Sequence, residues 1–159
     1  MITVITGPVD CGKTSEINKI FENSGGDGFI SPKVYRDGVF VGYDLKHLAT
    51  GETRALARIG KCSGFEGNLE YGRFLFSRGS FDYANSILID MAKNSIKPIF
   101  IDEIGPVELF GGGFHNGIIS AIEANVDLYL VIGYRCFREA VDKFHIGEYR
   151  ILIPKRSCR

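Results

Sequence analysis

The sequence has 159 residues, of which 45% are hydrophobic and 24% charged, an ordinary composition for a globular domain. Lysine plus arginine equals aspartate plus glutamate at 19 each, so the formal net charge is zero. This balance argues against broad electrostatic capture of nucleic acid or of an anionic membrane. No segment approaches the run of about 18 apolar residues that a membrane-spanning helix needs, so we expect no membrane partner.

The cysteines and the N-terminus indicate a cytoplasmic protein. The four cysteines stand far apart, at positions 11, 62, 136 and 158, without a C-x-x-C pair or a Cys/His cluster. Such spacing argues against zinc binding and is typical of free thiols in a reducing compartment. No basic segment followed by a long apolar run marks the N-terminus as a secretory signal.

The chain opens with a predicted strand and a predicted helix. Residues 2–6, ITVIT, are a β-branched run that ends at Gly-Pro, the pattern of a buried strand. Ile17, Ile20 and Phe21 follow helical spacing, and the breaker NSGGDG ends this helix.

The next segment, at about residues 29–60, is rich in strand patterns. Asp37-Gly38 lies between two apolar stretches, a strong hairpin signal, and ATGET turns the chain again. We therefore expect an inserted antiparallel β-ribbon of two or three strands. Residues 60–79 are glycine-rich, and RFLFS within them is a candidate for one more strand.

From Ser80 onward, helix and strand patterns alternate. Helical spacing recurs over 80–91, 114–122 and 137–144, and apolar strand patterns lie at 97–104, 126–134 and 150–154. Apolar runs that alternate with amphipathic helices indicate a mainly parallel central sheet with helices on both faces. We predict one α/β domain over residues 1–159.

The loop between the first strand and the first helix reads GPVDCGKT and matches the phosphate-binding pattern G-x-x-x-x-G-K-[ST]. Its glycines let backbone N–H groups converge on an anion, and the helix adds its positive N-terminal end. Lys13 would contact the β- and γ-phosphates, and the Thr14 hydroxyl would bind Mg²⁺. The predicted nucleotide-binding residues are Gly7, Pro8, Val9, Asp10, Cys11, Gly12, Lys13, Thr14 and Ser15, with Cys11 expected to be a small filler.

Two carboxylates follow the apolar run PIFI. A P-loop needs a second carboxylate for its metal at the end of a neighbouring strand, and Asp102 is placed to hold Mg²⁺, through a water. Glu103 comes next and would orient or deprotonate a water that attacks the γ-phosphate. The sequence therefore predicts a P-loop NTPase fold.

GPVDCGKT together with IDEIGPVELF resembles the small P-loop nucleoside-triphosphatases that carry a D-E-I-G-x-x-E-L motif, the thermophile-type or cancer-related NTPases, which are relatives of the RecA-like ATPases. VGYDLKHLATGETRALARIG and VIGYRCFREAVDKF extend the similarity over nearly the whole chain. The resemblance implies Mg²⁺-dependent hydrolysis of ATP, GTP and other nucleoside triphosphates, with Asp102 as the Mg²⁺ aspartate and Glu103 as the catalytic acid. At Pro106 and Val107 the chain departs from the lysine and methionine that the family often has.

Several further residues have two interpretations each. Arg135 follows a predicted strand, on the ligand edge of the sheet, and is either an arginine finger for the γ-phosphate or part of a surface salt bridge. Arg58 either reaches phosphate or a partner subunit, or is a solvated strand end. Glu108 either holds water or Mg²⁺, or accepts backbone N–H groups and fixes its loop, and we favour the second role. The insert's aromatic residues Tyr35, Phe40 and Tyr43 either stack on a nucleobase or pack, and we favour packing.

We predict Mg²⁺-dependent hydrolysis of nucleoside 5′-triphosphates to diphosphate and phosphate, with Lys13, Glu103 and Arg135 as catalytic residues. A small-molecule or nucleotide kinase would use the same loop, with an acceptor hydroxyl in place of water. A nucleotide-dependent switch would instead present the ribbon to a protein partner. No N-K-x-D signature of guanine recognition is present, so the preferred base stays open.

Overall fold

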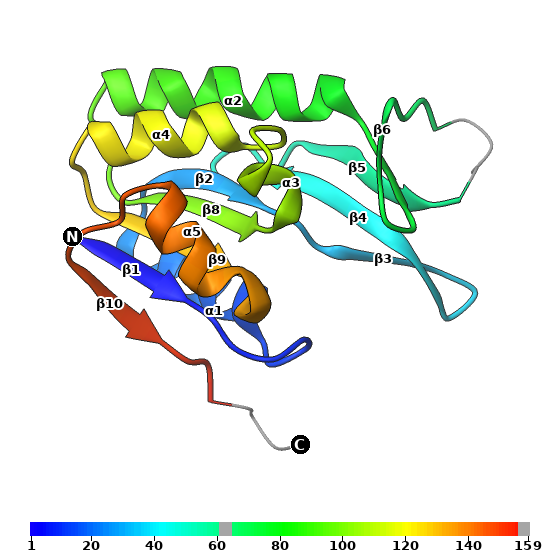
Figure 1. The fold of residues 1–159 in the computed structure, drawn as a ribbon, viewed down its shortest axis with the longest axis horizontal. Coiled ribbons are helices and arrows are strands. Elements are labelled where there is room, and N and C mark those ends of the chain that lie inside the picture. The colour runs from blue at the N-terminus through cyan, green and yellow to red at the C-terminus, as the bar shows by residue number, and fades with distance from the viewer. Residues whose placement is uncertain (61–64, 156–159) are drawn as a thin grey trace.

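The structure, a computed structural model, describes residues 1–60 and 65–155. Within these residues ten strands form one mixed sheet in the order β10-β1-β9-β8-β2-β4-β5-β7-β6, with β3 paired to β4 (Figure 1). The strands are β1 (Ile2–Ile5), β2 (Asp27–Ile30), β3 (Lys33–Arg36), β4 (Val39–His47), β5 (Thr53–Ile59), β6 (Leu69–Tyr71), β7 (Phe74–Phe76), β8 (Ile99–Ile104), β9 (Leu128–Ile132) and β10 (Tyr149–Leu152). The helices are α1 (Lys13–Ser24), α2 (Arg78–Lys93), α3 (Pro106–Leu109), α4 (His115–Glu123) and α5 (Phe137–Lys143), with a 3₁₀ turn, η1, at Tyr134–Cys136.

Five strands form the parallel half of the sheet and the centre of the core. β10, β1, β9, β8 and β2 pair in parallel. In β8, Ile99 and Ile101 are buried on one face and Phe100 on the other. Strands buried on both faces consist of continuous apolar residues, and this is why the sequence located most of them.

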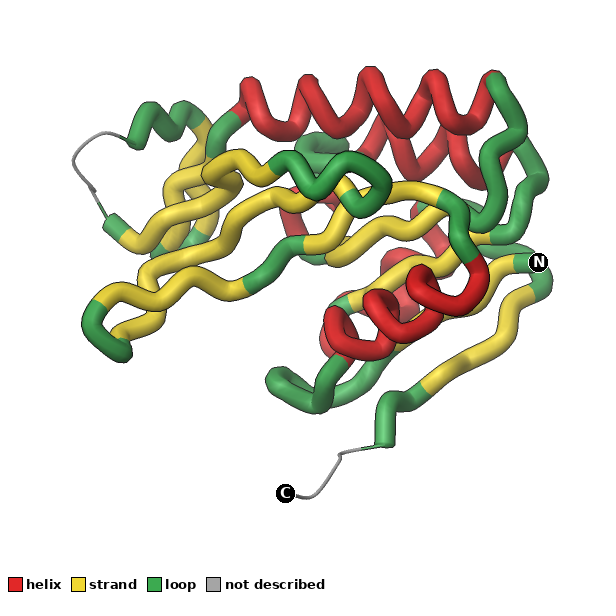
Figure 2. The backbone as a smooth tube through the Cα atoms, turned by 180° about the vertical axis from the view of Figure 1, so that it is seen from behind, coloured by secondary structure: helices red, strands yellow, loops and turns green. Residues whose placement is uncertain are grey.

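Helices cover both faces of the parallel half, which confirms that prediction. α2, α4 and α5 share one buried cluster through Leu88, Ile118 and Ala140. α1 packs on the opposite face through Ile17, against Phe100. In Figure 1 α5 lies in front of the parallel strands, and from behind, in Figure 2, α1 is the helix in front. None of the helices in the described part of the chain is long and apolar enough to cross a membrane.

The antiparallel half is the inserted ribbon, and β2 joins it to the parallel half by pairing antiparallel with β4. β3, β4, β5, β7 and β6 pair antiparallel and extend to one side (Figures 1 and 2). Residues 29 and 30, which the prediction placed in this ribbon, pair antiparallel with β4, and their strand β2 also pairs in parallel with β8. The pairing with β8 was not predicted, because the short segment DGFI contains too few apolar residues to indicate that partner strand. RFLFS contains β7, as expected, whereas β6 was not predicted.

Gly28 is the residue that lets β2 approach β8 closely. Its φ is +153°, and a Cβ added there would lie 2.0 Å from the carbonyl oxygen of Phe100. The backbone of β8 in the central sheet cannot move away from an added methyl group. We therefore expect Gly28→Ala to lower the free energy of unfolding, measured by urea denaturation, by at least about 2 kcal/mol.

Gly79→Ala is the matched control. Gly79 lies in the first turn of α2, which begins at Arg78 after the N-cap Ser77, slightly earlier than the expected start at Ser80. A Cβ at position 79 meets only the Ser77 hydroxyl, at 3.8 Å, so alanine there should raise the free energy of unfolding by about 0.5–1 kcal/mol. Equal stability of the two variants would contradict the close approach of β2 and β8.

Candidate nucleotide-binding site

The loop between β1 and α1 has the backbone that a phosphate cradle requires. Gly12 adopts φ 92° and ψ 22° at the N-terminus of α1, a left-handed conformation that glycine adopts without strain. Asp10 is also left-handed, at φ 61°. Cys11 is buried, and its Sγ lies 2.8 Å from where a Cβ on Gly7 would stand. The thiol therefore fills the space beside Gly7, in agreement with the expected filler role.

Two side chains at the start of α1 are oriented by hydrogen bonds. The Lys13 ammonium donates to the carbonyl oxygens of Gly7, at 3.3 Å, and Pro8, at 3.1 Å. The Thr14 hydroxyl donates to Oδ2 of Asp102 at 2.7 Å, across 88 residues of sequence. The phosphate loop and the end of β8 therefore meet at one point.

Asp102 is a buried carboxylate at the end of β8, with 2% of its surface exposed. Besides Thr14, the backbone N–H of Ser31 donates to its Oδ2 at 3.3 Å, and the Ser31 hydroxyl donates to its carbonyl oxygen at 2.5 Å. Burial raises the pKa of Asp102, while the hydrogen bonds from Thr14 and Ser31 and the charge of Lys13 oppose the rise. A cation would therefore stabilise the ionised form of this carboxylate.

A bulge turns the next carboxylate in another direction. The pairing of β8 with β9 shifts between Ile101 and Ile104, so three steps along β8 match two along β9. Asp102 is buried as a result, whereas Glu103 is exposed. An added Cβ on Gly133, just after β9, would lie 3.1 Å from Oε1 of Glu103, so this carboxylate stands beside the end of β9.

The pKa of Glu103 is raised to about 7. The main cause is desolvation by the surrounding strand ends, and the Asp102 carboxylate adds to it. The charges of Lys13 and Lys33 lower it. Glu103 is partly exposed to solvent, and its carboxyl group lies near one negative and two positive side chains at the edge of the sheet. A pKa shifted toward neutrality by such surroundings is typical of a group that exchanges protons.

The strand order differs from the simplest expectation. The sequence placed Asp102 on a strand next to β1, but β9 lies between β1 and β8. The end of β1 is joined to the end of β9 by a hydrogen bond from the Thr6 hydroxyl to the Ile132 carbonyl oxygen at 2.9 Å. The Thr14 hydroxyl, farther along the phosphate loop, reaches past β9 to Asp102 on β8. Strand order depends on long-range packing, which a local motif does not encode.

Arg135 lies in η1, two residues beyond Gly133, at the same edge of the sheet. Arg135 is exposed to solvent. The structure thus brings Arg135 to the ligand side of the sheet next to the strand end that Glu103 contacts. Its role as an arginine finger stays a prediction.

Glu108 holds the segment after β8 in place. It is buried and accepts the N–H of Gly105 at 2.9 Å and the N–H of Phe114 at 3.2 Å. A Cβ on Gly113 would lie 2.0 Å from Oε1 of Glu108, so the carboxylate is enclosed by the chain itself. These contacts are the structural role that we favoured from the sequence.

Arg58 has neither of the two expected roles. It is buried, and its guanidinium donates to the Tyr43 carbonyl oxygen at 2.7 Å and to Oδ1 of Asp44 at 2.6 Å. It therefore joins β5 to β4 inside the ribbon. The sequence did not indicate this role because both hydrogen-bond partners of Arg58 lie on another strand, β4.

The ribbon aromatics pack on one another, as we favoured. Phe40 lies between Tyr35 and Tyr43, with ring centroids at 5.9 Å and 5.2 Å, and Phe74 extends the cluster. Lys33 and Arg73 lie over the Phe40 ring. The cluster stiffens the ribbon near the phosphate loop.

The donor set fits Mg²⁺ rather than zinc. The Thr14 hydroxyl and the Asp102 carboxylate are hard oxygen donors. The described residues contain no group of three or more His, Cys, Asp or Glu that could enclose a metal ion. Mg²⁺ commonly takes only one or two protein oxygens and completes its shell with phosphates and water, so this pair of donors suits it.

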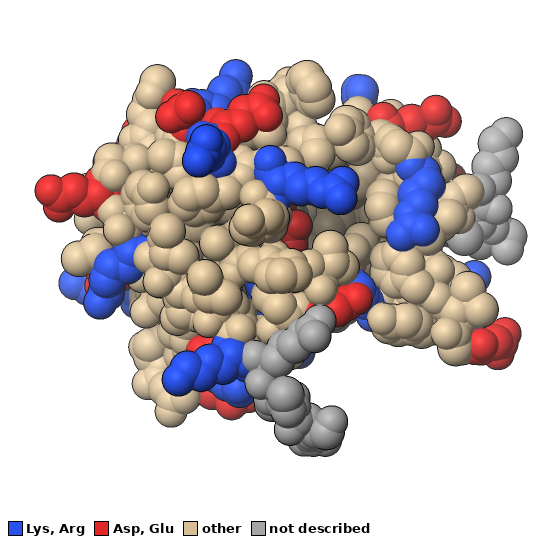
Figure 3. All heavy atoms as spheres, turned by 60° about the horizontal axis from the view of Figure 1, so that its bottom comes forward, with Lys and Arg blue, Asp and Glu red and all other residues tan. Residues whose placement is uncertain are grey.

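Figure 3 shows the side of the molecule where the loop after β1 lies. A hollow near the middle of this face has acidic atoms in it and at its edge, with lysine and arginine side chains around it. This mixture of charges suits an anion that carries its own metal cation.

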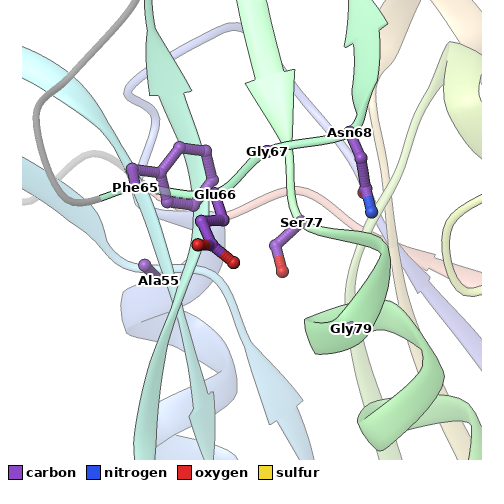
Figure 4. Close-up of a pocket in the computed structure, with 7 residues that line it drawn as sticks. All are labelled: Ala55, Phe65, Glu66, Gly67, Asn68, Ser77 and Gly79. Carbon is purple, nitrogen blue, oxygen red and sulfur yellow. The ribbon is translucent and has the colours of Figure 1, made fainter.

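A separate hollow of about 840 Å³ lies at the start of α2, away from the phosphate loop (Figure 4). Two of its polar side chains serve the start of α2: Ser77 accepts the N–H of Ser80, and the Asn68 side chain accepts the N–H of Arg78. We therefore assign it no ligand. Its lining residues are Ala55, Phe65, Glu66, Gly67, Asn68, Ser77 and Gly79.

Two residues of the site were missed by the sequence analysis, Ser31 and Lys33. Ser31 donates to Asp102, and Lys33 pairs with Asp10 of the phosphate loop. Both follow β2, and only knowledge that β2 lies beside β8 would have indicated them.

A phosphate-type loop that opens a helix at the edge of a parallel sheet, with its threonine bonded to a buried strand-end aspartate, defines a P-loop nucleotide-binding protein. The sequence matches the family described as NTPase over residues 2–152. It is 32% identical over 113 residues to the nucleoside-triphosphatase THEP1 of Archaeoglobus fulgidus, covering 69% of this chain and 63% of that protein. The match thus spans slightly less than two thirds of that relative.

Two solved structures have the same fold. The crystal structure of THEP1 from Aquifex aeolicus superposes with a TM-score of 0.78 at 23% identity, covering 100% of this chain and 92% of that one. The solution structure of a human cancer-related nucleoside triphosphatase has a TM-score of 0.70 at 25% identity, covering 95% and 87%. The chain therefore belongs to the NTPase family of nucleoside-triphosphatases, and the resemblance and the P-loop fold inferred from its sequence are confirmed.

The pH dependence of stability tests the environment of Glu108. Burial raises the pKa of Glu108 from 4.5 to about 7, against the N–H donors that lower it. A raised pKa in the folded state favours the protonated form, so the stability it contributes is complete below pH 4.5 and is lost as the pH rises through about 7. Relative to Glu108→Gln, which does not titrate, the free energy of unfolding should fall by up to about 3 kcal/mol from about pH 4 to pH 8. A difference that grows with pH would mean that the two N–H groups keep Glu108 ionised.

Proposed function

We propose that this protein hydrolyses nucleoside 5′-triphosphates to diphosphates and phosphate at this site, with Mg²⁺ as cofactor. The observation that carries the proposal is the 2.7 Å hydrogen bond from the Thr14 hydroxyl to the buried Asp102 carboxylate, which joins the phosphate loop to the strand end where Glu103 stands. The family membership supports the same reaction. The free thiols Cys11 and Cys136 support a cytoplasmic location.

The phosphate loop and Lys13 would bind the triphosphate. The N–H groups of residues 9–14 and the N-terminus of α1 would surround the β-phosphate. Lys13 now donates to two carbonyl oxygens of its own loop, and these weak partners would be exchanged for charged phosphate oxygens. Charge on the transferring phosphoryl group would thus be stabilised by groups already in position.

Thr14 and Asp102 would hold the metal. The Mg²⁺ that these two residues would hold would supply positive charge beside the triphosphate. Thr14 would turn its hydroxyl from Asp102 toward the cation, and Asp102 would bind it directly or through water. Because Asp102 is buried, its orientation is fixed before any ligand arrives.

Glu103 would act on the attacking water. Its carboxylate stands beside Gly133 at the open edge of the sheet and next to Asp102, and its pKa of about 7 lies near neutrality. A base of this pKa accepts a proton from water more readily than an ordinary glutamate does. Arg135, at the same edge, would approach the γ-phosphate.

The first test is the loss of the loop lysine. Lys13→Ala should weaken binding of Mg²⁺-ATP at least about 100-fold and abolish turnover, because it removes the ammonium group with which the loop would contact the phosphates. Equilibrium binding and phosphate release both measure this. Retained turnover would contradict the assignment of the loop.

A second test separates binding from chemistry. Glu103→Gln keeps the size of the side chain but removes the base, so nucleotide binding should change less than about threefold while turnover falls at least about 100-fold. Release of inorganic phosphate is measured with ATP, GTP, CTP and UTP, with and without Mg²⁺ and without any acceptor. Tight binding without phosphate release in the unmodified protein would favour a kinase, or a switch that needs a partner.

A further inference from the structure

Lys33 connects the ribbon to the phosphate loop. It is the first residue of β3, and its ammonium forms an ion pair with the Asp10 carboxylate, 23 residues earlier in the chain. The Lys33 side chain retains 30% of its exposure and Asp10 67%, so the pair lies at the solvent-facing side of the loop. The same ammonium stands 5.4 Å from the centre of the Phe40 ring, which supports its stem.

The backbone that carries Lys33 is fixed at the metal side of the site. Ser31, two residues earlier, donates to Asp102 through both its N–H and its hydroxyl. The segment from Ser31 to Lys33 therefore contacts Asp102 at one end and the phosphate loop at the other. The positive charges of Lys33 and Lys13 also lower the pKa of the Glu103 carboxyl group. These contacts surround the place that the outer phosphate of a bound nucleotide would occupy.

Asp10 places a negative charge in a loop that must accept an anion. Its carboxylate would repel the phosphates unless a cation neutralised it. Lys33 provides that cation, but an ion pair between partly exposed side chains is weak. A phosphate group carrying its own negative charge is the stronger partner for an ammonium.

We propose that Lys33 is a second lysine of the triphosphate site, which leaves Asp10 and contacts the γ-phosphate when a nucleoside triphosphate binds. The inference rests on the proposed function. A diphosphate lacks the γ-phosphate, so Lys33 stays on Asp10 when a diphosphate is bound. The ribbon thereby distinguishes substrate from product by one ion pair.

The test is a binding cycle with two Mg²⁺-nucleotides, the non-hydrolysable adenosine 5′-(β,γ-imido)triphosphate and ADP. Lys33→Met should weaken binding of the imido analogue at least about tenfold and that of ADP less than about twofold, because only the analogue has the γ-phosphate. Lys33→Gln is measured beside it, and unchanged ADP binding establishes that each variant is folded. Lys19→Met is the matched control, since Lys19 is also paired with a carboxylate, Glu16, but on the exposed side of α1.

The direction in which Asp10→Asn changes the affinity for the imido analogue distinguishes the proposal from its alternatives. Asparagine tolerates the left-handed backbone of position 10, and it releases Lys33, so the imido analogue should bind about two- to fivefold more tightly. If the ion pair were only a latch that shapes the loop, Asp10→Asn and Lys33→Met would weaken binding alike, and the proposal would be wrong. If Lys33 only screened Asp10, Lys33→Met would have no effect in the Asp10→Asn background, whereas direct contact predicts the same tenfold loss there.

Lys13→Ala, measured in parallel, separates this inference from the proposed function. If Lys13→Ala binds both nucleotides as the unmodified protein does, the phosphate loop itself is misassigned. If Lys13→Ala loses both nucleotides and the Lys33 variants keep both, the proposed function stands and Lys33 has no part in binding the γ-phosphate.

Discussion

A buried carboxylate at the end of a central strand is the constraint on which the site depends. Asp102 has almost no contact with solvent, so its charge needs partners in the protein or in a ligand. The Thr14 hydroxyl and the Ser31 N–H supply hydrogen bonds, but no cationic side chain within residues 1–60 and 65–155 is bonded to it. The remaining need for positive charge is what makes this point of the described structure suited to a metal ion.

The parallel sheet is what brings these groups together. β1 ends in the phosphate loop and β8 ends in Asp102 and Glu103, and parallel strands present these ends at one edge. α1 packs beneath through Ile17 and fixes the start of the helix where Lys13 and Thr14 lie. The bulge in β8 then separates the two adjacent carboxylates, so that one is buried and the other faces the edge.

The antiparallel ribbon completes the edge from the other side. It enters through Ser31 and Lys33, which contact Asp102 and the phosphate loop respectively. Inside the ribbon, Arg58 ties β5 to β4. The ribbon therefore contacts both Asp102 and the phosphate loop, and Lys33 joins that loop to the insert.

The sequence predicted the parts of this arrangement that are local. GPVDCGKT and the apolar run before Asp102 each carry their own pattern, so the loop, β8 and most helices were located before the structure. The role of Glu108 was also accessible, because its partners Gly105 and Phe114 are close in the chain. What the sequence did not predict was long-range: the pairing of β2 with β8, the position of β9 between β1 and β8, and the contacts of Ser31, Lys33 and Arg58 all depend on strand order, which no local pattern records.

The central claim is that the Thr14–Asp102 contact marks the metal position. A crystal structure with Mn²⁺ and the imido analogue of ATP, with the metal located by its anomalous scattering, tests it most directly. We expect one strong peak in contact with the Thr14 hydroxyl and the outer phosphates, with Asp102 bound directly or through one water. A nucleotide-associated peak elsewhere, with Thr14 still bonded to Asp102, would contradict the account.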